Sequence, residues 1–239
     1  MYLNEISFKG TVKKLYLYKF KAYATWFITL IVLQLAGLLF SLGGVGSSGG
    51  GSFRVLHVSF DIIFIFTLIW VFSTAIHVAR YSLDLDLTFI SNRRSISLAS
   101  LAFLLSSAAL GTLTAVLCGM LLRVVMYYIH GGALVAPLGP LVLLGSALSG
   151  FLYTSLAGSL GYLVGTLVRK SRVFTVLIPA LAIGTLFIPV KEDAPLFMEA
   201  IFFFTQESSP LLLILKTLLS ASLLYGGTMV LFNRMEVIK

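Results

Sequence analysis

The sequence predicts an all-α integral membrane protein with six transmembrane helices and both termini in the cytoplasm. Three observations support this: 59% of the 239 residues are hydrophobic, 11% are charged, and the mean hydropathy is +1.02. In soluble domains about a quarter of the residues are charged. The charged residues here are too few to cover a soluble fold, and the single cysteine, Cys118, excludes a disulfide scaffold.

Six apolar runs supply the expected spans. Each approaches or exceeds the roughly 20 residues that a helix needs to cross about 30 Å of hydrocarbon. None alternates polar and apolar residues with period two, so we expect helices rather than barrel strands. A glycine- and serine-rich segment, residues 43–52, predicts a flexible loop after the first run. The expected spans are residues 23–42, 55–79, 98–129, 141–168, 173–190 and 211–232.

The basic residues predict the orientation. Thirteen of the seventeen Lys and Arg residues lie on segments that share a side with the N-terminus. The other side carries four: Arg54, Arg123, Lys191 and Lys216. Because short cytoplasmic loops carry an excess of Lys and Arg, both termini are expected inside. The net charge of +8 therefore indicates topology and contact with anionic lipid rather than binding of nucleic acid.

The segment before the first span has a pattern of its own. On a helical wheel four residues form one apolar face: Phe8, Val12, Leu15 and Tyr16. Lysines surround this face, so residues 4–20 predict an amphipathic helix in the inner membrane interface. Lys19 interrupts the apolar stripe, but its long stem could carry the ammonium group out to water. The alternative is an unstructured basic tail that only sets the topology.

Ionisable residues inside spans are functional candidates by default. His57 and Asp61, four residues apart, would share a helix face near the outer end of the second span. They could bind a proton or a metal, or form a hydrated interfacial pair. Arg123 and Lys216 lie near outer ends, where snorkelling explains them, and His77 near an inner end, where packing does. The centres of the spans contain no ionisable residue, which disfavours proton-coupled transporters and ion pumps.

Enzyme motifs are missing from the sequence. It contains no H-E-x-x-H, no C-x-x-C, no paired intramembrane aspartates and no Walker A sequence. One cysteine and three scattered histidines make a structural zinc site implausible. We therefore expect no catalytic residue, no metal and no cofactor on this chain.

Small residues and prolines distinguish the later spans. Pro179, Gly184 and Pro189 predict that the fifth span is kinked or short. Residues 191–210 are apolar but too short to cross, which predicts a short re-entrant or surface helix on the outer side before the last span. In the fourth span two rows of small residues four apart predict a packed interior helix: Gly150, Thr154 and Gly158, and Ala157, Gly161 and Gly165.

The main inner segment is the predicted loop of residues 80–97. Five apolar residues within eight positions are more than a solvated connector needs. Apolar side chains surrounded by charged ones are typical of a helix that docks onto a soluble partner. The alternative is an interfacial stretch that rests on lipid. The apolar residues are Leu83, Leu85, Leu87, Phe89 and Ile90, and the charged ones are Asp84, Asp86, Arg93 and Arg94.

This layout resembles the small permease subunits of bacterial ABC-2 type exporters. A basic amphipathic segment precedes six spans, and the main inner loop ends in Asn92-Arg93-Arg94, directly before the third span. The resemblance covers residues 1–239 as a single transmembrane domain. It implies that residues 1–21 are the connecting (elbow) helix and that residues 83–94 contain the coupling helix that enters a cleft of the ATPase. Family loops often have glycine where this chain has Asn92.

The resemblance also implies a function and partners. The chain would be one half of an exporter in the bacterial cell membrane, dimerised with an identical or paralogous permease chain. Two separate ATP-binding-cassette ATPase subunits would hold ATP and Mg, so this chain would not itself be an enzyme. An amphiphilic substrate such as a drug, an antimicrobial peptide or a lipid would suit the 19 Phe, 10 Tyr and 2 Trp residues. The alternatives are a non-transporting assembly or sensor subunit that docks a cytoplasmic partner, and an intramembrane enzyme.

Overall fold

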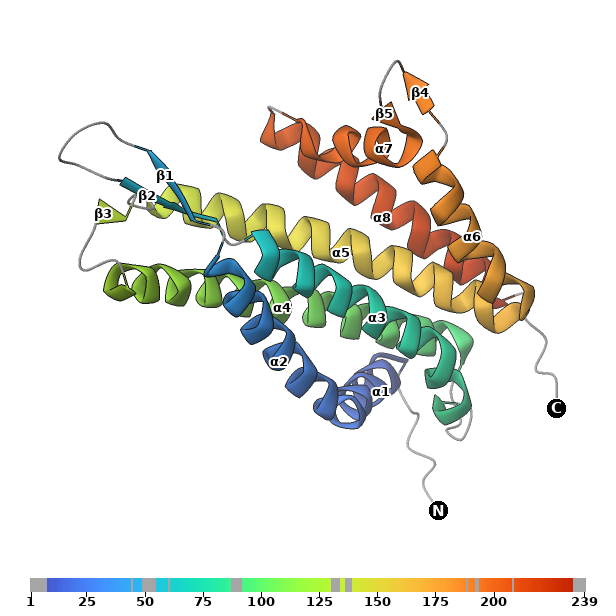
Figure 1. Ribbon diagram of the computed structural model, residues 1–239. Helices are drawn as coiled ribbons and strands as arrows, with labels where there is room; N and C mark the ends of the chain where they lie inside the picture. Colours follow the sequence, from blue (N-terminus) through green and yellow to red (C-terminus); the bar gives the residue numbers. More distant parts are fainter. Residues whose placement is uncertain are drawn as a thin grey trace.

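The computed structural model describes residues 8–43, 45–48, 55–59, 61–86, 92–129, 134–135, 139–187, 189–191, 194–207 and 209–233. These residues form a helical bundle with short strands at its edge (Figure 1). The helices are α1 (Phe8–Ala22), α2 (Ala24–Ser41), α3 (Asp61–Asp86), α4 (Arg93–Ile129), α5 (Pro140–Lys170), α6 (Val173–Phe187), α7 (Leu196–Thr205) and α8 (Pro210–Asn233). The strands are β1 (Val45–Ser48), β2 (Val55–Val58), β3 (Leu134–Val135), β4 (Pro189–Lys191) and β5 (Ala194–Pro195).

Within the described residues, five helices are long and apolar enough to cross a membrane: α2, α3, α4, α5 and α8. The multi-pass, helical character predicted from the sequence is therefore confirmed. The run expected as the fifth span forms α6, which has 15 residues with Pro179 inside. At 1.5 Å per residue it is about 22 Å long, shorter than the roughly 30 Å of hydrocarbon. The prediction of a short element there is confirmed.

The start of the second predicted span is wrong. Residues Val55–Val58 form β2, which pairs antiparallel with β1 and parallel with β3, and α3 begins only at Asp61. Periodicity does not separate a short apolar strand from the first turn of an apolar helix. In the segment predicted as a flexible loop, Val45–Ser48 is a strand, and the strand partner provided by β1 is what makes β2 extended.

The helices α3 and α5 lie at the centre of the bundle. α3 contacts α2, α4 and α5, and α5 also contacts α4 and α8. Small residues of α5 allow a close approach: a Cβ atom on Gly165 would lie 2.7 Å from both the Cβ atom of Ala79 and the carbonyl oxygen of Ile76. The predicted packed interior helix is therefore present, and Gly158, Gly161 and Gly165 face α3.

Polar side chains join α2 to its neighbours inside the bundle. The Nε2 atom of Gln34, which is 1% exposed, donates hydrogen bonds of 3.1 Å to Oγ1 of Thr67 in α3 and to the carbonyl oxygen of Gly111 in α4. The indole nitrogen of Trp70 donates to the carbonyl oxygen of Trp26 at 3.0 Å. Within a membrane such contacts add to the packing between helices, because no water competes for them.

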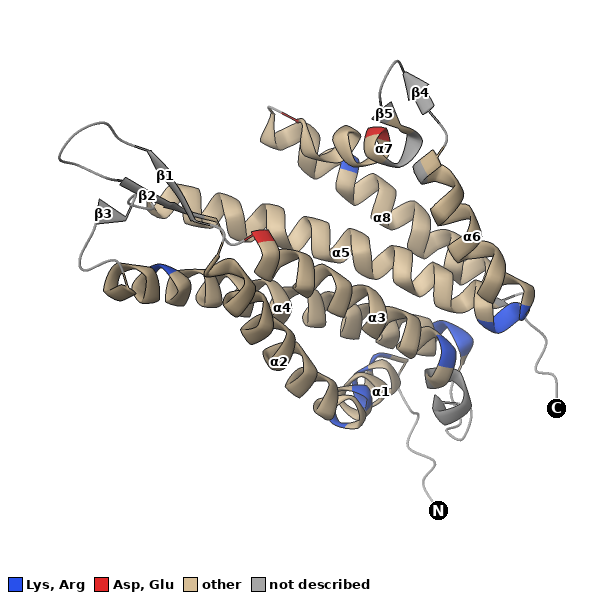
Figure 2. Cartoon of the chain, viewed as in Figure 1, with Lys and Arg blue, Asp and Glu red and all other residues tan. Residues whose placement is uncertain are grey.

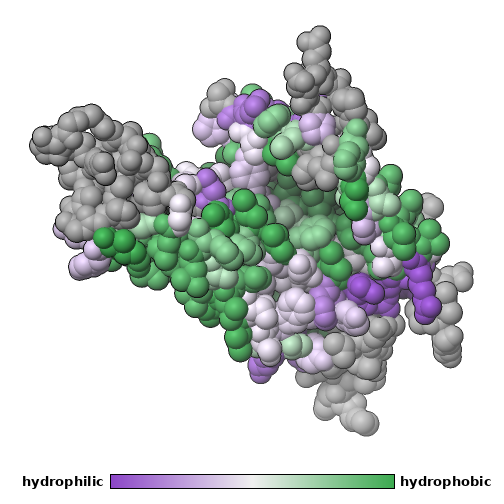
Figure 3. Space-filling view, viewed as in Figure 1, coloured by the Kyte–Doolittle hydropathy of each residue, from purple (hydrophilic) through white to green (hydrophobic). Residues whose placement is uncertain are grey.

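The outer faces of the spans are apolar. Leu39 of α2 is 66% exposed and Leu223 of α8 is 75% exposed. Figure 3 shows apolar residues over the middle of the visible face, with hydrophilic residues mainly around the helix ends. This surface is suited to lipid rather than to water.

Candidate functional site

Basic side chains gather at one end of the bundle (Figure 2). At this end lie α1, the end of α3, the start of α4 and the turn between α5 and α6. We call it the basic end. Loops on the cytoplasmic side of membrane proteins carry such an excess of basic residues. Its Lys and Arg residues are Lys9, Lys13, Lys14, Lys19, Lys21, Arg80, Arg93, Arg94, Arg169, Lys170 and Arg172.

The ends of α3 and α5 are joined at the basic end. Arg169 lies in the last turn of α5, and its Nη1 atom donates a hydrogen bond of 3.1 Å to the carbonyl oxygen of Arg80 in α3. The guanidinium carbon of Arg80 lies 5.8 Å from the centroid of the Tyr81 ring. A side-chain contact therefore supplements the glycine packing that holds these two helices together.

The helix α1 packs onto the bundle through Leu15. This side chain is 4% exposed and belongs to a cluster with Ile96 and Ala99 of α4 and Phe232 of α8. The N-terminal segment thereby contacts both the first turns of α4 and the last turns of α8. α1 is a docked helix of the bundle, in contrast to the alternative of an unstructured tail.

The remaining residues of the predicted apolar face of α1 lie in different surroundings. Val12 and Tyr16 are half-buried against the Leu15 cluster, and the Tyr16 hydroxyl donates to Oγ of Ser106 in α4 at 3.3 Å. Phe8 is 50% exposed. Lys19 is 1% exposed, so the expectation that it snorkels to water is wrong: the packing of α1 against the bundle encloses its stem and ammonium group.

The boundaries predicted for the inner loop are also wrong. α3 continues to Asp86, so Leu83, Asp84, Leu85 and Asp86 lie in its last turns, and α4 begins at Arg93. Helices are not required to end at the membrane surface, and both extend beyond the apolar run that predicted them. Leu87, Phe89 and Ile90 lie outside the described residues.

The start of α4 is defined by Asn92. Its carbonyl oxygen accepts a hydrogen bond of 3.2 Å from the backbone N–H of Ile96, and asparagine is a preferred residue at this position. Arg93 is half-buried and Arg94 is exposed. Of the residues assigned to partner docking, Arg94 is therefore one that the structure presents to solvent at the basic end.

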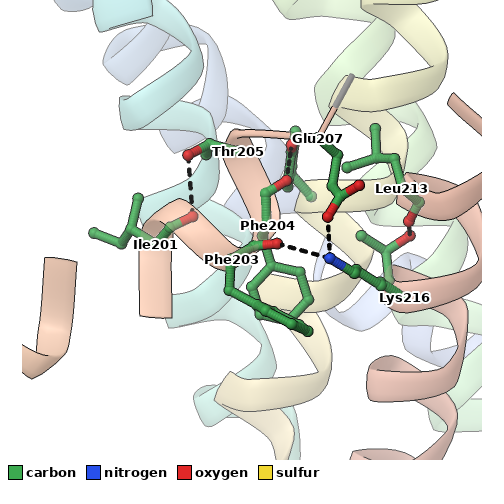
Figure 4. Close-up of polar contacts among 9 residues, drawn as sticks. Ile201, Phe203, Phe204, Thr205, Glu207, Leu213 and Lys216 are labelled. Atoms are coloured by element: carbon green, nitrogen blue, oxygen red, sulfur yellow. Dashed lines mark hydrogen bonds and ion pairs between the residues drawn. The ribbon is translucent and has the colours of Figure 1, made fainter. Parts of the chain in front are cut away.

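The opposite end of the bundle contains an ion pair between α8 and the segment after α7 (Figure 4). Nζ of Lys216 pairs with Oε1 of Glu207, and the two side chains are 25% and 19% exposed. The same Nζ lies 4.1 Å from the ring centroid of Phe203. A carboxylate and an aromatic ring therefore surround the charge of Lys216, in addition to the partial exposure of its side chain. The hydroxyl of Tyr153 in α5 donates to the carbonyl oxygen of Phe204 at 2.8 Å.

The predicted His57 and Asp61 pair does not share a helix face. His57 lies in β2, and Asp61 is the exposed first residue of α3, where its carboxylate accepts a hydrogen bond from the Ser59 hydroxyl. His77 lies between the rings of Trp26 and Tyr81, with centroid distances of 4.4 Å to each, which is the packing role expected. Among the described residues no three His, Cys, Asp or Glu side chains come together to hold a metal.

Two contacts were not predictable from motifs. Arg169 to Arg80 and Tyr153 to Phe204 each join a side chain to a backbone oxygen of another helix. Backbone acceptors have no residue signature, so only the fold reveals them. Comparison of the chain with protein-family models, with curated proteins and with solved structures finds no match.

Proposed function

We propose that this chain is the permease subunit of an ABC-2 type exporter in a bacterial cell membrane. The observation that carries the proposal is the composition of the basic end, where α1 lies beside the ends of α3 and α4. A membrane protein driven by a cytoplasmic ATPase needs a rigid docking surface on its inner side. Helix ends that are packed and hydrogen-bonded to one another supply such a surface.

In this proposal the basic end faces the cytoplasm. α2, α3, α4, α5 and α8 cross the membrane, α6 is a short sixth crossing, and α7 returns on the outer side. Both termini are then cytoplasmic. The excess of Lys and Arg at one end supports this orientation.

In this proposal, movements of the bound ATPase would pass to the bundle through α3. The last turns of α3 and the N-terminus of α4 would contact a cleft of the ATPase, with Arg93 and Arg94 on the rim. The next residues of α4, including Ile96 and Ala99, would stay covered by α1. α3 packs on α5 through Gly165, and Arg169 joins the two helix ends, so a displacement of the α3 end would move both helices together. Packed helices move as discrete rigid units rather than deforming continuously.

A second permease chain and an amphiphilic substrate complete the proposal. The apolar outer faces of the spans provide surface for an identical or related chain. ATP and Mg would be held by two ATPase subunits, and no step of hydrolysis is assigned to residues of this chain.

The proposal predicts that a neighbouring gene encodes an ATP-binding-cassette ATPase, and the test is coexpression of the chain with that ATPase. We expect the ATPase to copurify with the chain in equal amounts and to hydrolyse ATP in nanodiscs. Arg94→Glu should reduce copurification at least about tenfold, because it reverses a charge on the docking rim. Arg172→Glu is the matched control, since Arg172 is also exposed at the basic end but lies in the turn between α5 and α6.

Two results would contradict the proposal. The first is the absence of ATPase from the purified complex. The second is copurification that Arg94→Glu and Arg172→Glu reduce equally, which would indicate non-specific attraction to the basic end. Copurification of a different cytoplasmic protein without ATP hydrolysis would instead support a sensor or assembly subunit.

A further inference from the structure

The helix α1 has two faces, and only one of them packs on the bundle. Leu15 is buried against α4 and α8, whereas Leu17, two residues later, is 47% exposed. These two positions are about 160° apart around the helix axis, so Leu17 lies on the opposite face. Lys13, Lys14 and Lys21 are also exposed and lie three or four residues from Leu17, a spacing that makes them its neighbours (Figure 2). We call these four exposed residues the lysine face.

The lysine face carries charge that the chain does not neutralise. The sequence of α1 contains no Asp or Glu. Within the part of the chain that the structure describes, the ammonium groups of Lys13, Lys14 and Lys21 form no ion pair. Three positive charges therefore surround an exposed leucine within about two turns of helix. A partner that fits this face has negative charge with an apolar region next to it.

The membrane is the anionic surface nearest to the lysine face. Only Tyr23 separates α1 from α2, a helix long and apolar enough to span the membrane. α1 also packs against the side of α4: the Tyr16 hydroxyl donates to Oγ of Ser106 at 3.3 Å, and the ring centroids of Phe20 and Phe103 are 6.1 Å apart. Ser106 is thirteen residues, or about 20 Å, from the start of α4. Because α1 lies beside α4 and not beneath its end, its opposite face is turned toward the surrounding lipid.

We propose that the lysine face of α1 binds the headgroups of anionic phospholipids such as phosphatidylglycerol. The three ammonium groups donate to phosphate oxygens, and such charge-assisted hydrogen bonds are stronger than neutral ones. The side chain of Leu17 enters the boundary between headgroups and acyl chains, as apolar side chains of interfacial helices do. The sequence predicts that the face with Leu15 meets the lipid, but α4 and α8 cover that face. The inference goes beyond the exporter proposal, because it concerns a lipid and not the ATPase.

A reporter at the centre of the lysine face measures the binding. Leu17→Cys is labelled with the fluorophore bimane in a Cys118→Ser background, which contains no other thiol. The full chain is placed in nanodiscs of phosphatidylcholine, to which nitroxide-labelled phosphatidylglycerol or phosphatidylcholine is added as the quencher. Each lysine near an anionic surface increases binding about fivefold. We therefore expect phosphatidylglycerol to quench at about a tenfold lower concentration than phosphatidylcholine, and salt to weaken this preference by screening the charges.

Matched pairs of substitutions assign the preference to the lysine face. Lys13→Gln with Lys21→Gln removes two charges, one on each side of residue 17, and should reduce the preference at least about fivefold. Lys13→Arg with Lys21→Arg keeps both charges and should keep the preference, so a loss in the glutamine variant is not a loss of the helix. Lys170→Gln with Arg172→Gln removes two exposed charges from the turn between α5 and α6 and should leave the preference unchanged.

The inference is overturned by equal quenching from the two lipids, which would indicate an acidic protein as the partner of this face. It is also overturned if the two glutamine pairs reduce the preference equally, which would indicate a general attraction of anionic lipid to the basic end. These measurements need no ATPase. A negative result here therefore leaves the exporter proposal standing, and a failure of ATPase copurification leaves the lipid-binding face standing.

Discussion

The Nη1 atom of Arg169 lies 3.1 Å from the carbonyl oxygen of Arg80, which fixes the end of α5 to α3 at the basic end. Arg169→Ala should therefore increase hydrogen exchange of the backbone amides in the last turns of α3, while the centre of the bundle stays protected. Arg172→Ala removes an equally basic but exposed side chain from the next turn and should leave exchange in α3 unchanged. Equal hydrogen exchange of the α3 amides in the two variants would show that the bond from Arg169 to Arg80 does not stabilise the end of α3.

The glycine contact between α5 and α3 predicts a large difference between two alanine variants of one helix. Gly165→Ala places a methyl group 2.7 Å from the Cβ atom of Ala79 and should destabilise the bundle by about 1–3 kcal/mol. At Gly145 a Cβ atom has no neighbour within 4 Å, so Gly145→Ala should be neutral or stabilising by up to about 1 kcal/mol. Unfolding of detergent-solubilised protein measures both. Similar losses would contradict close packing at Gly165.

The docking of α1 predicts a difference between two of its leucines. Leu15 is 4% exposed in the cluster with Ile96 and Phe232, whereas Leu17 is 47% exposed. Leu15→Ala should cost about 2–5 kcal/mol of unfolding free energy, the usual range for a buried leucine. Leu17→Ala should change it by about 0.5 kcal/mol or less. If the loss at Leu17 were the larger, α1 would be held by lipid and not by α4 and α8.

The ion pair between Lys216 and Glu207 predicts a response to charge exchange. Either Lys216→Glu or Glu207→Lys alone should loosen the segment after α7 from α8, because it places like charges side by side. The double variant restores opposite charges and should restore the contact. Protease sensitivity between α7 and α8 reports the attachment. Because both side chains are partly exposed, the pair contributes about 1 kcal/mol or less, and a double variant as sensitive as the single ones would contradict the assignment.

Hydrophobic runs predicted most of the spans because their ends carry strong signals. The run of α5 ends at Arg169 and Lys170, and that of α8 begins next to Pro210, so both helices lie within a few residues of the prediction. The start of α3 was not predictable, because Val55–Val58 is apolar and forms a strand only through its pairing with β1. The apolar residues of this segment do not show which other segment it will pair with as a strand.

The candidate sites were less predictable than the spans. The sequence placed Leu15 on an apolar face directed at the membrane interface, whereas it packs inside the bundle, because its contacts with Ile96 and Phe232 depend on residues far along the chain. The burial of Lys19 likewise depends on what packs around α1 rather than on its place in the stripe.

Two hydrogen bonds from α5 to other helices also have a mechanical consequence. The Tyr153 hydroxyl donates to the carbonyl oxygen of Phe204 in α7, and Arg169 donates to that of Arg80 in α3. Positions 153 and 169 are sixteen residues apart on one uninterrupted helix, a separation of about 24 Å. Because α5 is bonded at both positions, it cannot move along its axis without stretching one of these two hydrogen bonds. The position of α7 therefore depends on the position of α5 at the basic end. A spectroscopic label on α7 should report the binding of a protein to that end.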